Sequence, residues 1–161
     1  MKPWKTRSPE IAHLLNPAFC ESTIYNVIFS YQKEAKKSLP FPLVYLILPI
    51  LLHKNTRGRI NSHTHLKVWI QNNPDVLIQF SIRARSLVKI TNEAIEFLLQ
   101  NQIINFNGSN LEIQKTLPSS KLKSCLDEEM QECFLKAEHV GKWFARSGAI
   151  ENVYVAWGVK P

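Results

Sequence analysis

The sequence contains few glycines and no catalytic signature. Five glycines occur among 161 residues, which is too few to build a phosphate-cradling loop readily. A P-loop, a G-x-S-x-G turn, an H-E-x-x-H helix and a paired acidic motif in an apolar setting are all missing. We therefore expect a protein that is not an enzyme, with no catalytic residue and no cofactor.

Cysteine and histidine are too few and too scattered to hold a metal or a disulfide framework. The three cysteines (Cys20, Cys125 and Cys133) form an odd set without a C-x-x-C pair. His63 and His65 lie two residues apart, but no third ligand follows at a spacing that suits zinc. We expect no metal site, and we expect Cys133 to be a buried thiol in the apolar stripe of a helix.

No hydrophobic run is long enough for a membrane span. The most apolar segment, residues 39–52, is shorter than the roughly 20 residues a spanning helix needs, and it contains Pro40, Pro42 and Pro49. No apolar run follows the opening cations as in a secretory signal. We expect no membrane association, a cytoplasmic location, and a buried helix near Pro42 that Pro49 kinks or ends.

The composition is that of a folded domain rather than a disordered chain. Apolar residues make up 45% and aromatic residues 10% of the sequence, which excludes intrinsic disorder. The sequence shows no internal repeat, low-complexity run or dividing linker. One domain over residues 1–161 is therefore expected.

Helix signals occur along most of the chain. Ser8-Pro9 predicts a short helix to about Leu15, and Asn16-Pro17 opens a longer one to about Lys37. Further helices are expected over residues 43–53, 65–71 and 74–86, and after Thr91. The last helix is the clearest, because one apolar seam recurs at steps of three and four residues: Leu126, Met130, Cys133, Ala137, Val140 and Phe144.

Two β features complete the expected fold. Apolar segments 103–106 and 111–113 flank Asn107-Gly108, a strong hairpin signal. Residues 153–157 predict a terminal strand that has Val153, Val155 and Trp157 on one face and Tyr154 and Ala156 on the other. Several helices followed by a hairpin indicate a mainly α fold with a small β component: a winged helix-turn-helix core with extra N-terminal helices, a long C-terminal helix and a terminal strand.

Positive charge is concentrated in one stretch. The net charge of the chain is +7. The stretch from His53 to Lys89 contains seven Lys and Arg residues and one acidic residue, Asp75, so its net charge is +6. The glycine-containing segment from Lys54 is expected to be an exposed loop. Either it is simply solvated, or its cations contact phosphate without sequence preference. The candidates for phosphate contact are Lys54, Arg57, Arg59 and Lys67.

The last helix carries the candidate partner-binding residues. Trp143 lies off the apolar seam, next to His139 and Arg146, and an exposed Trp beside Arg is typical of a binding hot spot. Trp157 joins them, because the terminal strand is more apolar than a free monomer tends to expose. The alternative is that another element of the same fold covers Trp143.

Three segments resemble one known group of proteins. They are RSPEIAHLLNPAFC (7–20), FPLVYLILPILLHKNTRGRI (41–60) and AEHVGKWFARSGAIENVYVAWGVKP (137–161). The chain resembles the middle component of bacterial three-component ABC systems, in which an SMC-like ABC ATPase and an effector accompany a small non-catalytic protein. Lamassu-type anti-phage and anti-plasmid defence is the best-known group.

The resemblance implies an adaptor that bridges the ATPase to an effector, often a nuclease, and that meets DNA through the assembled complex. The alternative is a stand-alone winged-helix DNA-binding regulator. Such a regulator reads DNA with the helix before the wing. Here that helix carries Glu93 and Glu96 and no Lys or Arg. The phosphates that border a DNA groove would repel these carboxylates.

Overall fold

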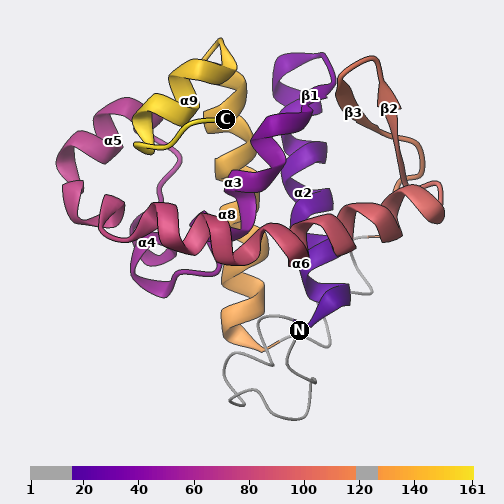
Figure 1. Cartoon of the computed structure of the whole chain (residues 1–161), viewed down its shortest axis with the longest axis horizontal. Helices are drawn as coiled ribbons and strands as arrows, with labels where there is room; N and C mark the ends of the chain where they lie inside the picture. The colour runs from indigo at the N-terminus through magenta and orange to yellow at the C-terminus, as the bar shows by residue number, and fades with distance from the viewer. Residues whose placement is uncertain (1–15, 119–126) are drawn as a thin grey trace.

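The computed structural model describes residues 16–118 and 127–161, and Figure 1 shows their arrangement. The α-helices are α2 (Pro17–Ala35), α3 (Val44–Leu51), α4 (Lys54–Arg59), α5 (Leu66–Asn72), α6 (Phe80–Gln100), α8 (Glu128–Arg146) and α9 (Ile150–Ala156). The remaining elements are the 3-10 helices η2 (Phe41–Leu43) and η3 (Pro74–Leu77) and the strands β1 (Leu39–Pro40), β2 (Ile104–Asn107) and β3 (Asn110–Ile113). The helix predicted over residues 8–15, together with Cys125 and Leu126, lies outside the described residues.

The helices α2 and α8 pack along each other and run parallel. Phe19 contacts Phe134 with ring centroids 5.4 Å apart, and the Ser30 hydroxyl donates to the Glu138 carbonyl at 2.7 Å. From the first contact to the second, the residue number increases along both helices, so the two helices are parallel. Figure 1 shows the two helices rising together behind α6.

Gly141 allows this close approach. A Cβ atom at this position would lie 2.7 Å from the Ser30 Cβ and 2.8 Å from the Val27 carbonyl oxygen. Real Cβ atoms do not tolerate such distances, so any side chain here forces the helices apart. Gly141 therefore sets the spacing of the principal helix pair.

Both helices carry a side-chain cap, of which the sequence predicted the one at Asn16. The Asn16 side chain accepts from the Ala18 amide at 3.0 Å, with Pro17 at the first helical position. Asp127 accepts from the Met130 amide at 2.8 Å at the start of α8. These caps use amide groups that the first helical turn leaves without partners.

The helix α3 is the buried centre of the fold. Seven of its eight residues are buried, and Pro49 lies inside it, which confirms the expected core helix near Pro42. It packs against α2, α6 and α8. Cys133 is fully buried, as expected, in a smaller cluster with Phe19, Met130 and Phe134.

The strands form a three-stranded antiparallel sheet in the order β1-β3-β2. The predicted hairpin is confirmed, and Gly108 provides the positive φ of +62° in its turn. The short strand β1 was not predicted; it pairs Leu39 with Leu111. A side-chain contact ties the sheet to α2, because the Ile113 amide donates to Gln32 Oε1 at 2.7 Å.

The predicted helix boundaries around Ser86 and Thr91 are wrong. Residues 80–100 form one continuous helix, α6, and only a 3-10 turn follows Pro74. Thr91 is fully buried inside α6 rather than capping it. The chain changes direction at Gln79, whose φ is 58°, and not at Thr91.

The predicted terminal strand is also wrong, because residues 150–156 form the helix α9. Val153 and Trp157 are buried, while Val155 is 76% exposed. Val153 and Trp157 lie four residues apart, so they share a helix face as readily as a strand face. The exposure of Val155 distinguishes the two possibilities.

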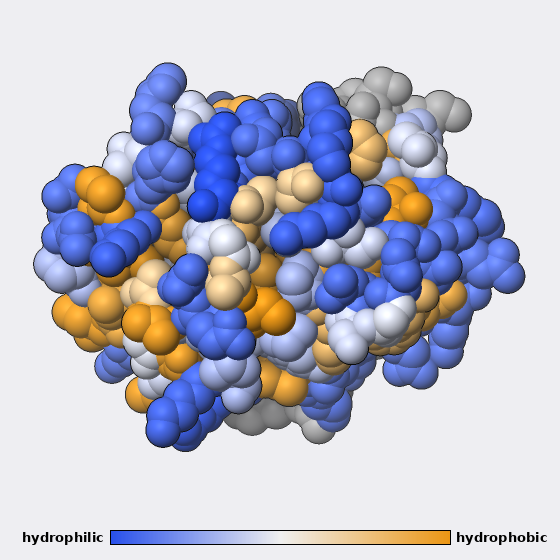
Figure 2. All heavy atoms as spheres, turned by 90° about the horizontal axis from the view of Figure 1, so that it is seen from above, coloured by the Kyte–Doolittle hydropathy of each residue, from blue (hydrophilic) through white to orange (hydrophobic). Residues whose placement is uncertain are grey.

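The outer surface is mostly polar, with scattered apolar residues. Figure 2, seen from above, shows apolar patches interrupted by hydrophilic side chains. No helix in the described part of the chain combines the length and the apolar character that crossing a membrane requires.

The contact at Gly141 generates a stability prediction. We expect Gly141→Ala to lower the free energy of unfolding by about 1–3 kcal/mol, because overpacking must displace Ser30 or the α2 backbone. Gly58→Ala in α4 is the matched control: its new Cβ would meet nothing within 4 Å, so it should not destabilise. Urea unfolding of the two variants measures both effects. Equal stability of the two variants would contradict this packing role.

Candidate partner-binding and phosphate-binding residues

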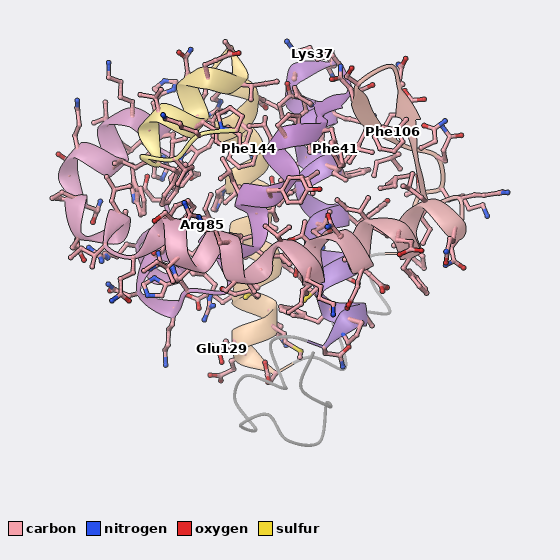
Figure 3. All side chains as sticks on the ribbon, in the orientation of Figure 1. Lys37, Phe41, Arg85, Phe106, Glu129 and Phe144 are labelled. Atoms are coloured by element: carbon pink, nitrogen blue, oxygen red, sulfur yellow. The ribbon has the colours of Figure 1, made fainter. Side chains whose placement is uncertain are left out.

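Arg57, a candidate phosphate-binding residue, is fully buried. Its guanidinium donates to Glu132 at 2.9 Å, to Glu129 at 2.6 Å and to the Leu51 carbonyl at 2.8 Å. The expected exposure of Arg57 is therefore wrong. Figure 3 shows Glu129 at the start of α8, which is the lower end of that helix in this view. Its partner Arg57 lies on α4.

The pKa of Arg57 reflects this pairing. Burial of the guanidinium favours its neutral form, but hydrogen bonds with Glu132 and Glu129 offset that effect and raise the pKa above its ordinary value. The group stays charged and holds α4 against α8. Its role is structural, since a phosphate cannot reach it without breaking these bonds.

The segment 54–64, expected to be an exposed loop, is instead ordered and anchored. Residues 54–59 form α4. The Trp69 indole donates to the Arg59 carbonyl at 2.8 Å, Lys136 donates to the Ile60 carbonyl, and the Trp143 indole donates to the Thr64 carbonyl at 2.8 Å. Three side chains from α5 and α8 thus fix the backbone that follows α4.

Arg59 also has a carboxylate partner. Its Nη1 and Nη2 lie 2.9 and 2.5 Å from the two oxygens of Asp75. The hydrogen bond from Arg59 lowers the pKa of Asp75 to about 2. This bidentate pair neutralises one of the cations that made the basic stretch conspicuous.

Lys54 and Lys67 are the remaining phosphate candidates. Both side chains are exposed, and in the described part of the chain neither forms a hydrogen bond or an ion pair. The structure therefore leaves two of the four predicted cations available to solvent. Phosphate contact through them stays a prediction.

Trp143 is covered by its own fold. It is 3% exposed, and its ring lies 4.9 Å from Trp69 between centroids. The expected surface position is wrong, and the alternative placement, under another element, is correct. The buried part of α8 is wider than its apolar seam, because α2 packs on one side and α5 with residues 59–64 on another.

Trp157 is buried as well. It is 1% exposed, stacks on Phe80 at 4.6 Å and lies 6.2 Å from Trp69. Its indole nitrogen has no hydrogen-bond partner among the residues that the structure describes. The three tryptophans join α5, α8 and α9 into one aromatic cluster, so Trp157 contributes core packing rather than a free surface.

His139 and Arg146 lie nearer the solvent. His139 is half-buried, and burial lowers the pKa of its imidazole. Arg146 is exposed and pairs with Glu34 of α2 at 2.9 Å. The structure does not bring the four predicted partner-binding residues together on one surface. Contact of His139 or Arg146 with a partner stays a prediction.

Reasoning from sequence missed the carboxylates that bind Arg57. Glu129 and Glu132 lie three residues apart at the start of α8, so they share one helix face. The spacing of the two carboxylates is compatible with binding one cation. No nearby residue in the sequence indicated that this cation is Arg57. Across residues 16–118 and 127–161, no group of three or more side chains is arranged to hold a metal ion.

Together, the fold and these contacts define a mainly helical protein with a small antiparallel sheet, whose buried charges serve packing. A family model described as ABC-three component (ABC-3C) system Middle Component 3 matches residues 4–161, and the chain belongs to this family. No curated protein and no solved structure matches the chain.

Removal of Arg57 should destabilise the fold rather than weaken only a surface contact. We expect Arg57→Ala to lower the free energy of unfolding by about 3–5 kcal/mol, the range for breaking a buried ion pair. Arg59→Ala is the control and should cost much less, since Arg59 and Asp75 are partly exposed to solvent. Chemical denaturation measures both. A similar small loss for the two variants would contradict the structural role.

Truncation of Trp143 should act on the core. Trp143→Ala should lower the free energy of unfolding by about 3–5 kcal/mol, because it leaves a cavity against Trp69. Trp143→Phe should cost less, since it keeps an aromatic ring, although it loses the hydrogen bond to Thr64 and part of the ring volume. Thermal melting of the isolated variants provides the measurement. An unchanged melting temperature for Trp143→Ala would show that this side chain is not internal.

Proposed function

We propose that this chain is a non-catalytic adaptor that bridges an SMC-like ABC ATPase to an effector, often a nuclease, in a Lamassu-type anti-phage or anti-plasmid defence complex. The observation that carries the proposal is the family: a middle component belongs to a system with other protein components. All catalytic steps belong to the partners, and the complex acts in the cytoplasm.

We further propose that the core is a winged helix. Helices α2, α3 and α6 supply its three helices, and the β2–β3 hairpin supplies the wing. The order of elements supports this: β1 follows the first helix, and the hairpin follows the third. The pairing of β1 with β3 supports it as well, because it places the wing beside the first strand. Helices α4 and α5 are an insertion between the second and third helices.

The surface of this core favours protein docking over DNA reading. The helix before the wing, α6, exposes Glu93 and Glu96, whose charge opposes a phosphate backbone. Aromatic side chains lie close by: Phe97 is 44% and Phe106 48% exposed. Phe106 packs against Phe41 with centroids 5.4 Å apart, close to the turn of the hairpin, and Figure 3 labels both residues.

The pairing of two arginines with carboxylates disfavours the alternative, a stand-alone DNA-binding regulator. Arg57 and Arg59, two of the candidates for phosphate contact, are bound to carboxylates of this chain. Contact with DNA is therefore assigned mainly to the assembled complex, and of the four candidates for phosphate contact only Lys54 and Lys67 have no carboxylate partner within the described residues.

An assembly experiment tests the adaptor role. The tagged effector should retain the ATPase only when this chain is co-expressed, because the adaptor supplies both contacts. Affinity capture followed by size-exclusion chromatography and mass spectrometry measures the composition. Omission of this chain is the control. Equal association of ATPase and effector without it would refute the bridging role.

A further inference from the structure

An open groove of about 490 Å³ lies between α6 and residues 158–161. Apolar side chains line much of it, namely Leu46, Ala84, Val88 and Val159, together with the rings of Tyr45 and Tyr154. Its size suits the side chains of a short peptide segment. It is separate from the partner-binding residues discussed above.

The wall opposite α6 is held by backbone contacts. Gly158 adopts a left-handed conformation, with a φ of +68°, that ends α9. The Gly158 amide donates to the Val155 carbonyl at 3.0 Å, and the Val159 amide donates to the Tyr154 carbonyl at 3.1 Å. This helix end directs residues 159–161 back along α6, so the groove is preformed.

The two tyrosine hydroxyls of the groove are already hydrogen-bonded. The Tyr45 hydroxyl donates to Asn92 at 2.7 Å, and the Tyr154 hydroxyl donates to the Pro42 carbonyl. Both tyrosines therefore direct their protons away from a ligand. The polar side chains of the lining that form no hydrogen bond within the described residues are those of Ser81, Arg85 and Lys160, and the last two are cations.

Arg85 differs from the other arginines of the described residues. Each of those forms hydrogen bonds within the chain: Arg57, Arg59, Arg83 and Arg146. Arg85 forms none within residues 16–118 and 127–161, and no Asp or Glu side chain lines the groove. Figure 3 shows Arg85 on α6 below the C-terminal segment. An unpaired guanidinium beside an apolar groove is suited to bind a carboxylate.

We propose that this groove binds an acidic segment of a partner protein, with an apolar side chain in the groove and a carboxylate on Arg85. Lys160 supplies the second cation. The proposal rests on the adaptor function only for the identity of the partner, which is then the ATPase or the effector. Charge complementarity carries it, because the described residues that line the groove include two cations and no carboxylate side chain.

Two other occupants are distinguished by the experiment below. A nucleic acid running along α6 would meet Glu93 and Glu96 after Lys89, and it would leave the apolar groove unused. A second copy of this chain could offer exposed carboxylates such as Glu93 and Glu96, so the oligomeric state of the Arg85→Glu variant separates it from a partner segment. An acidic peptide uses both the charge and the apolar surface.

Binding of the isolated full chain to short overlapping peptides from both partner subunits tests the proposal. We expect an acidic peptide to bind, and Arg85→Glu to weaken it about tenfold or more, since this variant replaces attraction by repulsion. Arg85→Lys should weaken it less. Lys37→Glu is the matched control, because Lys37 is also exposed, has no partner in the described residues and lies at the end of α2 near the hairpin. Fluorescence anisotropy measures each affinity.

The outcomes separate this proposal from the adaptor function. If the wild-type complex assembles but no acidic peptide binds, or Arg85→Glu and Lys37→Glu have equal affinities, the groove assignment is wrong and the adaptor stands. If peptide binding follows Arg85 but the subunits assemble without this chain, the adaptor role fails instead. Loss of duplex DNA binding alone in Arg85→Glu, or a dimer that this variant dissociates, would overturn the acidic-segment proposal.

Discussion

The rest of the structure depends on the close parallel contact of α2 with α8 at Gly141. Each helix then positions one functional region. The helix α2 holds the sheet through Gln32 and β3, which places the hairpin beside α6. The helix α8 holds α4 through Glu129, Glu132 and Arg57. A wider spacing of the two helices would displace both regions at once, although neither lies at the glycine.

The distribution of charge distinguishes structural cations from available ones. Net charge along the sequence suggested a basic binding surface, yet Arg57 and Arg59 bind carboxylates of the same chain. A buried guanidinium with two carboxylate partners positions helices, whereas an exposed and unpaired one can bind a ligand. The surface that remains combines a few free cations, exposed aromatic side chains and the acidic end of α6. This mixture favours several small protein contacts over one extended phosphate contact.

Local signals predicted the elements whose cause is local. The Asn16 cap, the hairpin around Gly108 and the core helix containing Pro49 all follow from short-range preferences of backbone and side chain. The errors have long-range causes. Trp143 lies off the apolar seam, but α5 and residues 59–64 cover it, and the carboxylate partners of Arg57 lie more than 70 residues away. Residues 150–156 were misjudged because the four-residue spacing of Val153 and Trp157 fits a helix and a strand alike, and only the exposure of Val155 separates the two.

The parallel pairing of α2 with α8 has a consequence for synthesis. The helix α2 lies near the start of the described chain, and its main packing partner follows more than 90 residues later. While the ribosome is still producing α3 to α6, Phe19 and the neighbouring apolar residues of α2 have no α8 to cover them. Such long-range closure slows folding, and exposed apolar surface on a nascent chain promotes aggregation. A chain that ends before residue 128 should therefore need chaperones or be degraded, so cells would preferentially accumulate subunits that include α8.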